Sequence, residues 1–260
     1  MTDALYVGAT GMRAHQTQVD TIANNVANLN TVGFKRETVS FSSVMAALQS
    51  GSVDPLGASL RENLVTRGAG AIASLQLSTN GGEIKATQQP LDVAIEGRGF
   101  FEVTMPDGAS AFTRAGAFTL SADGMLSTAA GLPLAARISI PTDANNLRIE
   151  SNGRVLADFA DRSDVELGNI EVANFANPAG LESLGDNLYR ATTGSGEMSM
   201  GVAGESGNGT LHQGYLESSN VQLVDELVSL MLAQRGFEMN SKIVQAADQM
   251  LGLANSLYRG

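Results

Sequence analysis

The 260-residue sequence predicts an α+β fold, in which long N- and C-terminal helices pack as a coiled-coil-like domain and a β-rich domain is inserted between them. Apolar side chains recur every seven positions near both ends of the chain, which places them on one stripe of a helix. From about Leu91 to Gln213 the apolar period changes to two, as in strands. Asp-Gly and Asn-Gly dipeptides separate the apolar runs there, and such dipeptides favour tight hairpin turns.

The last forty or so residues, Tyr215 to Gly260, carry the longest helical pattern. No proline interrupts it, and Gly236 and Gly252 are isolated, so we expect the helix to bend or weaken there rather than end. Ser219 with Gln222 three residues later predicts a capping box at its start. A helix of about 38 residues is about 57 Å long, too long for one small globule to bury. Its predicted packing residues are Leu223, Leu227, Leu230, Phe237, Val244 and Leu251.

Residues 3–29 predict a second long amphipathic helix. Its predicted packing residues are Leu5, Met12, Val19, Ile22 and Val26. Each terminal helix is apolar over more than one narrow stripe, so packing the two helices on each other would leave part of each apolar surface uncovered. The surplus apolar surface predicts contacts with other copies of the chain.

The segment NNVANLNTVGFKR, residues 24–36, predicts the end of the first helix followed by a turn. Asn28 and Thr31 compete for backbone hydrogen bonds and destabilise a continuing helix. Gly33 can adopt the positive φ that ends one, and Phe34 then supplies an apolar anchor.

The middle of the chain predicts strands and turns. LDVAIEGRGFFEV, residues 91–103, alternates as a strand and breaks at Gly97 and Gly99. We expect tight turns at Asp107-Gly108, Asp123-Gly124 and Asn152-Gly153, further strands at residues 170–175 and 187–192, and a glycine-rich surface loop at residues 193–209.

These patterns divide the chain into three predicted parts. Residues 1–35 and 216–260 form the helical terminal domain, residues 36–69 a connecting arm, and residues 70–215 the β-rich domain. Within and just beyond the arm, residues 37–49 predict a short helix or an extended segment, residues 50–57 a loop, and residues 68–73 a loose segment.

Composition excludes several classes of protein. The formal net charge is −11 and lies almost entirely between the two predicted helices, so no basic patch for nucleic acid is expected. There is no cysteine for thiolate or disulfide chemistry. No apolar run approaches the roughly 20 residues that span a bilayer, so direct membrane insertion is not expected. The first eleven residues also lack the pattern of a cleaved signal peptide.

The sequence predicts no catalytic, cofactor-binding or metal-binding residues. His15 lies on the apolar stripe of the first helix, and His212 lacks metal-ligand spacing to other residues. Gly97-Arg98-Gly99 lacks the third glycine of a dinucleotide loop and predicts a strand bulge. The acidic cluster at residues 158–166 lacks the glycine and terminal glutamate of a calcium loop, so we interpret it as a solvated turn.

Taken together, the two ends resemble the bacterial flagellar rod and hook protein family. Residues 24–36 are similar to the N-terminal signature of that family, in which we single out Asn24, Asn25, Asn28, Gly33 and Phe34. GYLESSNVQLVDELVSLMLAQRGFEMNSKIVQAADQML, residues 214–251, is similar to its C-terminal signature. Residues 91–103, 112–128 and 180–189 resemble further blocks of the family in the same order. Length and the middle blocks are most similar to the distal rod members.

The resemblance implies a structural subunit that polymerises into a rigid hollow helical drive shaft and transmits torque to the hook. The terminal helices would form an inner tube and the β-rich domain would face outward. Implied partners are other copies of the chain, proximal rod proteins, the hook protein, the P and L ring proteins of the basal body, and the flagellar type III export apparatus. The implied location is the basal body, from the periplasm to the outer membrane.

Three alternatives remain open on the sequence alone. One is a proximal rod or hook subunit of the same family, since residues 40–66 depart most from the expected pattern. Another is an enzyme that remodels the cell wall, which would need a catalytic carboxylate pair or a Cys/His arrangement. The third is a coiled-coil adaptor, which predicts a small defined oligomer instead of long polymers.

Overall fold

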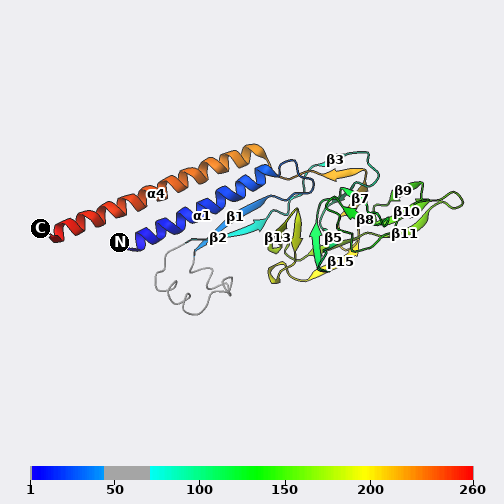
Figure 1. Ribbon diagram of the computed structural model, residues 1–260, viewed down its shortest axis with the longest axis horizontal. Helices are drawn as coiled ribbons and strands as arrows, with labels where there is room; N and C mark the ends of the chain where they lie inside the picture. The colour runs from blue at the N-terminus through cyan, green and yellow to red at the C-terminus, as the bar shows by residue number, and fades with distance from the viewer. Residues whose placement is uncertain (1, 44–70, 260) are drawn as a thin grey trace. The chain divides into compact units, whose positions relative to one another are not determined.

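The computed structural model describes residues 2–43 and 71–259 and has an α+β fold, with an N-terminal helix, a β-rich middle and a C-terminal helix. The chain divides into two units (Figure 1). The first unit consists of the described parts of Met1–Ala27, Glu37–Gln76 and Gln222–Gly260. The second consists of Asn28–Arg36 and Leu77–Val221.

In the first unit, two helices lie side by side with a strand pair next to them (Figure 1). The helices are α1 (Thr2–Ala27) and α4 (Leu223–Arg259), and the strands are β1 (Glu37–Ser43) and β2 (Ala71–Leu77). β1 lies along α1, where the rings of Phe41 and His15 have centroids 6.0 Å apart. As predicted, α4 continues through Gly236 and Gly252 without ending.

The start of α4 differs from the prediction. The helix begins at Leu223, and the first helical hydrogen bond runs from the Glu226 N–H to the Gln222 carbonyl. The Ser219 hydroxyl instead accepts from the Val221 N–H at 3.3 Å, inside a turn that precedes the helix. The predicted capping box is therefore wrong, because the Ser219 side chain satisfies the backbone two residues ahead, as serine often does in turns.

The segment between the helices is partly extended. Residues 37–43 form β1, which agrees with the extended alternative for that stretch. Residues 71–73 were predicted to be loose but belong to β2, because the backbone of β2 pairs with that of β1. The Thr38 hydroxyl also donates to the Gln76 carbonyl across this pair at 3.3 Å. The loop predicted at residues 50–57 lies outside the described residues.

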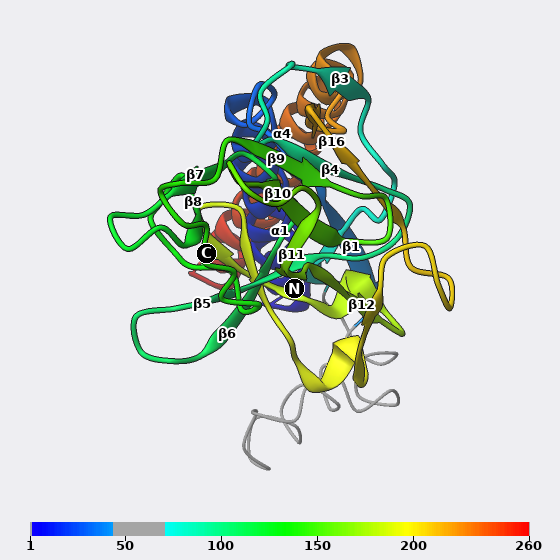
Figure 2. The same ribbon diagram turned by 90° about the vertical axis from the view of Figure 1, so that its right-hand side faces the viewer.

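The second unit is built from short strands that pair antiparallel (Figure 2). Figure 2 shows β9, β10 and β11 next to one another, and they form one sheet. The largest sheet has the order β13-β14-β6-β5, and four strand pairs complete the unit: β12-β15, β16-β4, β17-β3 and β7-β8. The strand bounds are β3 Ile84–Ala86, β4 Val93–Glu96, β5 Phe101–Thr104, β6 Ser110–Thr113, β7 Phe118–Leu120, β8 Leu126–Thr128, β9 Asn146–Ile149, β10 Arg154–Asp158, β11 Val165–Asn169, β12 Glu171–Phe175, β13 Glu182–Gly185, β14 Leu188–Arg190, β15 Met198–Val202, β16 Thr210–Gln213 and β17 Tyr215–Glu217.

The predicted turns are confirmed. Gly108, Gly124 and Gly153 have φ values of +83°, +72° and +94°, and they connect β5 to β6, β7 to β8 and β9 to β10. The predicted break after β4 is also confirmed, with positive φ at both Gly97 and Gly99. Glycine takes this region of φ without the steric penalty of a side chain, so the turns follow directly from the sequence.

The predicted surface loop at residues 193–209 is wrong in part. It contains a short 3-10 helix, Thr193–Ser195, and the strand β15, which pairs with β12 from Glu171↔Val202 to Phe175↔Met198. The glycines of this stretch suggested a loop, but Gly201 lies within β15 because the partner strand supplies its hydrogen bonds.

Two buried apolar clusters hold the second unit together. The larger cluster is mainly aliphatic: Val93, Ile95, Phe101, Phe118, Leu126, Leu134, Ile138, Ile140, Ile149, Val155, Ile170, Val172, Ala203 and Leu211. The smaller cluster is rich in aromatic rings: Leu77, Phe100, Phe112, Ala173, Phe175, Leu181 and Tyr189. Its rings meet edge to face, for example Phe112 and Phe175 with centroids 4.9 Å apart, an arrangement that aromatic quadrupoles favour.

The two units differ from the predicted domains at several boundaries. Residues 71–76 belong to the helical unit, whereas residues 28–36 and 216–221 belong to the β-rich unit. The segment at residues 28–36 belongs there because hydrogen bonds tie it to the β-rich unit. The Gly33 N–H donates to the Glu217 carbonyl at 2.7 Å, and the Asn187 side-chain amide donates to the Val32 carbonyl at 2.7 Å.

We predict that Gly33→Ala destabilises the second unit far more than Gly131→Ala does. Both glycines have positive φ, +68° and +80°, so both substitutions carry the left-handed penalty of about 1–2 kcal/mol. Only at Gly33 would the new Cβ also lie 2.5 Å from the backbone of Arg114, whereas nothing lies within 4 Å at Gly131. Urea unfolding, followed by hydrogen exchange of the second-unit strands, should show that Gly33→Ala lowers the free energy of unfolding by about 3 kcal/mol or more. Equal losses for the two variants would contradict the packing role of Gly33.

Candidate functional site

In the seam between α1 and α4, glycines of one helix face larger side chains of the other helix. A Cβ added at Gly8 would lie 2.6 Å from Cγ2 of Val244, and one added at Gly11 would lie 2.7 Å from the side chain of Asn240. On α4, a Cβ added at Gly236 would lie 2.5 Å from the His15 ring. The buried alanines Ala14, Ala233 and Ala247 belong to the same two helices. The two helices therefore approach closely only because these positions carry little or no side chain.

The predicted packing residues are distributed unevenly around this seam. Ile22 is buried, whereas Leu5, Met12, Val19, Val26, Leu230 and Val244 are half-buried. Leu223, Leu227 and Phe237 are 43%, 46% and 39% exposed in the single chain. Leu251 belongs to α4, but its side chain lies outside the described residues. The sevenfold repeat of α4 is thus not covered by α1 alone.

We call the exposed large apolar residues of α4 its apolar face. They are Leu223, Val224, Leu227, Val228, Met231, Leu232, Phe237, Met239, Ile243, Met250 and Leu253. Many are three, four or seven positions apart, so they lie next to one another along the helix. Neighbouring exposed apolar residues of this kind are typical of interaction sites, whereas single exposed apolar residues are common on any protein surface.

Asn25 connects three elements of the first unit, a role that the sequence pattern did not reveal. Its side chain is 1% exposed; the amide donates to the Glu37 carbonyl at 2.8 Å and to the Glu226 carboxylate at 3.3 Å. Its carbonyl oxygen accepts from the Glu37 N–H at 3.0 Å. A buried amide with these partners fixes α1 against the start of β1 and the first turn of α4.

The other residues of the N-terminal motif shape the turn after α1. The Asn28 side-chain oxygen accepts from the Thr31 hydroxyl at 3.0 Å, and Phe34 is buried as an anchor. Asn24 is exposed on α1. Gly33 has φ of +68°, which confirms the predicted conformation, but α1 already ends at Ala27. Gly33 therefore shapes the later part of the turn and not the helix end.

A buried ion network lies in the second unit. The Glu217 carboxylate accepts from the Lys35 ammonium at 2.7 Å and from the Arg114 Nε at 2.8 Å, and the side chains of all three residues are at most 4% exposed. The Gly82 N–H donates to the same carboxylate at 2.7 Å. We did not predict this network, although each of the three charged residues falls in a different block of the family resemblance. That coincidence is the signal that could have found it.

The network shifts the acid–base properties of two groups. Burial alone would raise the pKa of Glu217, but Arg114 and Lys35, with the hydrogen bonds from Lys35 and Gly82, hold that pKa below its ordinary value. Burial, together with the nearby Arg114 charge, lowers the pKa of Lys35 despite the opposing effect of Glu217. Glu217 is thus held as a carboxylate between two cations.

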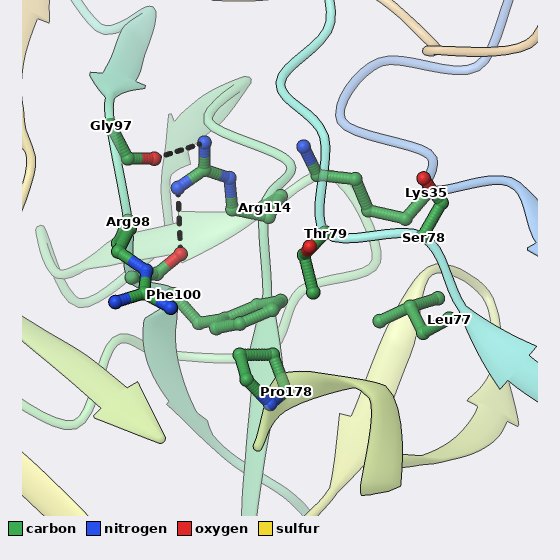
Figure 3. A pocket seen from close by; sticks show the side chains of 10 residues that line it. Lys35, Leu77, Ser78, Thr79, Gly97, Arg98, Phe100, Arg114 and Pro178 are labelled. Atoms are coloured by element: carbon green, nitrogen blue, oxygen red, sulfur yellow. Dashed lines mark hydrogen bonds between the residues drawn. The ribbon is translucent and has the colours of Figure 1, made fainter. Parts of the chain in front are cut away.

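A small cavity of about 70 Å³ opens beside this network (Figure 3). Figure 3 shows the Arg114 guanidinium donating to the backbone carbonyl of Gly97 at the cavity wall. This bond is 3.0 Å long, and Arg114 also donates to the Gly99 carbonyl at 2.7 Å. The lining residues are Lys35, Leu77, Ser78, Thr79, Gly97, Arg98, Gly99, Phe100, Arg114 and Pro178.

Histidine and carboxylate side chains do not gather into a metal site within residues 2–43 and 71–259. No group of three or more histidine, cysteine, aspartate or glutamate residues there could hold a metal ion. His212 Nε2 lies 2.7 Å from the Glu96 carboxylate, and His15 Nδ1 lies 3.2 Å from Gln18 Oε1. Within the described residues, neither α1 nor α4 has a stretch that is long and apolar enough to cross a bilayer.

Comparison with known proteins gives matches along most of the chain. Three family models match: the "Flagella basal body rod protein" model at residues 5–35, the "Flagellar hook protein FlgE/F/G D1 domain" at 94–157, and the "Flagellar basal body rod FlgEFG protein C-terminal" model at 212–257. The flagellar basal-body rod protein FlgG of Borreliella burgdorferi is 39% identical over the whole of both chains. That of Agrobacterium fabrum is 40% identical over 97% of this chain and 98% of its own. The flagellar hook-basal body complex protein FlhP of Bacillus subtilis is 29% identical over 99% of this chain and 100% of its own.

We predict that Glu217→Gln destabilises the second unit by about 3–5 kcal/mol, because it leaves two buried cations without their carboxylate. The control is Glu182→Gln, which removes an exposed ion pair with Arg190 and should lose less than about 1 kcal/mol. Since the folded-state pKa of Glu217 is lowered, its stabilisation is present above the ordinary pKa of 4.5 and is lost as pH falls through the folded-state pKa. Urea unfolding at several pH values should show this acid-dependent loss in wild type, and a loss of the same size in Glu217→Gln would refute it.

The two glycines of α4 give a second, matched prediction. Gly252→Ala should increase helix stability by about 1 kcal/mol, because nothing lies within 4 Å of the added Cβ. Gly236→Ala should lower it, since the Cβ would displace the His15 ring from the seam. Thermal unfolding followed by circular dichroism at the helix band measures both, and a gain for Gly236→Ala as large as for Gly252→Ala would show that the seam is not closely packed.

Proposed function

The chain belongs to the family of flagellar basal-body rod and hook proteins, and from this premise we propose that it is a structural subunit of the bacterial flagellar rod. It is a structural protein and not an enzyme, as its full-length relatives are named for the rod. The observation that carries the proposal is the full-length similarity to rod proteins together with the apolar face of α4. A subunit of a polymer must leave such a surface for its neighbours.

We further propose that the chain assembles head to tail into a helical polymer. A contact between two different surfaces of the same chain, repeated without closure, generates a helical filament. The apolar face of α4 supplies one such surface, because α1 does not cover it. Leu223, Leu227 and Phe237 would then pack against helices of other copies in a coiled-coil-like arrangement.

The similarity to rod proteins supports finer proposals. We propose the distal rod as the place of this subunit, in a rigid hollow shaft that transmits torque to the hook and runs from the periplasm to the outer membrane. In that shaft the terminal helices would form the inner tube and the β-rich unit the outer layer. The proposed partners are proximal rod proteins, the hook protein, the P and L ring proteins and the flagellar type III export apparatus.

A second candidate is a proximal rod or hook-family subunit of the same axial structure. The match of residues 94–157 to a domain model shared with hook proteins, and the similarity to a hook–basal body complex protein, favour this alternative. The two candidates share the assembly surface and differ in the neighbours that the subunit contacts.

We predict that Leu227→Asp blocks assembly while leaving the single chain folded. Leu227 is 46% exposed, so an aspartate there is tolerated in the monomer, but burying its charge in a subunit interface is unfavourable. Leu120→Asp makes the same substitution at a residue of the second unit that is also 46% exposed, and it is the matched control. Sedimentation and electron microscopy of concentrated protein should show polymers for wild type and the control only. Normal polymers of Leu227→Asp would argue against this face as the interface.

A further inference from the structure

The cavity beside the ion network carries more positive than negative charge. Lys35, Arg98 and Arg114 line it, and no acidic residue is among its lining residues. Among the described residues, the carboxylate that pairs with Lys35 and Arg114 is that of Glu217. Two of the three cations are almost fully buried, and unbalanced charge in such a site is unfavourable. The site therefore has the electrostatics of a receptor for an anion.

The buried cations retain donor capacity and are held rigidly. The Lys35 ammonium has three N–H donors, and two of them have partners, the Glu217 carboxylate at 2.7 Å and the Asn80 carbonyl at 2.9 Å. Arg114 is fixed by Glu217 and by the carbonyls of Ile95, Gly97 and Gly99. Groups fixed in this way lose little further conformational freedom when a ligand binds.

Arg98 supplies a third, exposed cation that lines the cavity. It lies between Gly97 and Gly99, which both have positive φ, and its side chain is exposed. In the part of the chain that the structure describes, no carboxylate forms an ion pair with its guanidinium. Figure 3 shows Arg98 and the Thr79 hydroxyl on the cavity wall, so a bound oxyanion would meet both charged and neutral donors there.

The size of the cavity limits the ligand. About 70 Å³ is well below the roughly 300–1,000 Å³ of sites that hold organic cofactors or drug-sized molecules. It is large enough for a single carboxylate or phosphate group. The polar donors named above match the oxygens of such a group, and guanidinium groups bind carboxylate and phosphate with short hydrogen bonds.

We propose that this cavity is a binding site for one oxyanion group. The group can come from a free inorganic anion or from an aspartate or glutamate side chain of another copy of this acidic chain. Bound there, it would balance the excess cationic charge and lock together the segments around Lys35, Arg98 and Arg114. The second source rests on the proposed polymerisation, whereas the existence of the site does not.

The first experiment measures binding to the dilute full-length chain. Calorimetric titration with sodium phosphate and sodium acetate, each against sodium chloride at matched ionic strength, should show saturable binding. Arg98→Gln should weaken it about threefold or more, because it removes an exposed charge without disturbing buried packing. Arg162→Gln, another exposed arginine of the second unit outside the cavity, should bind as wild type does. If neither anion binds saturably, or if Arg98→Gln binds as tightly as wild type does, the proposal is overturned.

The second experiment identifies the source of the oxyanion. The anion that binds is added during assembly, again at matched ionic strength. If it slows polymer growth of wild type but not of Arg98→Gln, the natural occupant is an acidic side chain of a neighbouring copy. If it binds and leaves growth unchanged, the occupant is a free anion. Failure of wild type to polymerise at all counts against the proposed function and leaves the binding result standing.

Discussion

Close approach of α1 and α4 through glycine and alanine is the constraint on which the rest of the first unit depends. Because Gly8, Gly11 and Gly236 carry no side chain, the two helix backbones lie close together, and many large apolar side chains of α4 remain exposed. A seam of large residues would have buried them within one chain. The seam thus decides that α4 keeps an apolar surface for a partner, and the proposed polymer follows from that surface.

In the second unit, three segments that are distant in sequence meet at a buried network of charged side chains. Lys35, Arg114 and Glu217 come from segments more than 70 residues apart in the sequence. The Lys35 ammonium and the Arg114 Nε nevertheless both donate to the Glu217 carboxylate, at 2.7 and 2.8 Å. A buried charge is stable only when it is paired and hydrogen-bonded, so this network holds only if all three segments are in place. It therefore fixes how the chain enters and leaves the β-rich unit, next to the turn that Gly33 shapes.

Local patterns in the sequence predicted much of the fold. The sevenfold repeats gave α1 and α4, and Asp107-Gly108, Asp123-Gly124 and Asn152-Gly153 gave three turns, because helix periodicity and positive φ depend on neighbouring residues alone. Partners distant in sequence could not be found in this way. β15 was missed because β12 supplies its hydrogen bonds, and the roles of Asn25 and Glu217 were missed because their partners lie in other segments. The repeat marked Leu227 and Phe237 as interface residues but could not show that small residues form the intrachain seam.

The central claim is that the apolar face of α4 is open in the single chain and covered in the polymer. Hydroxyl-radical footprinting of methionine tests this directly, since Met231, Met239 and Met250 are 54%, 63% and 51% exposed on that face. Met198 of the β-rich unit, 42% exposed, serves as the internal reference. We expect the three α4 methionines to oxidise rapidly in dilute protein and to become protected on assembly relative to Met198. Equal protection of these methionines in the dilute and the concentrated protein would contradict the account.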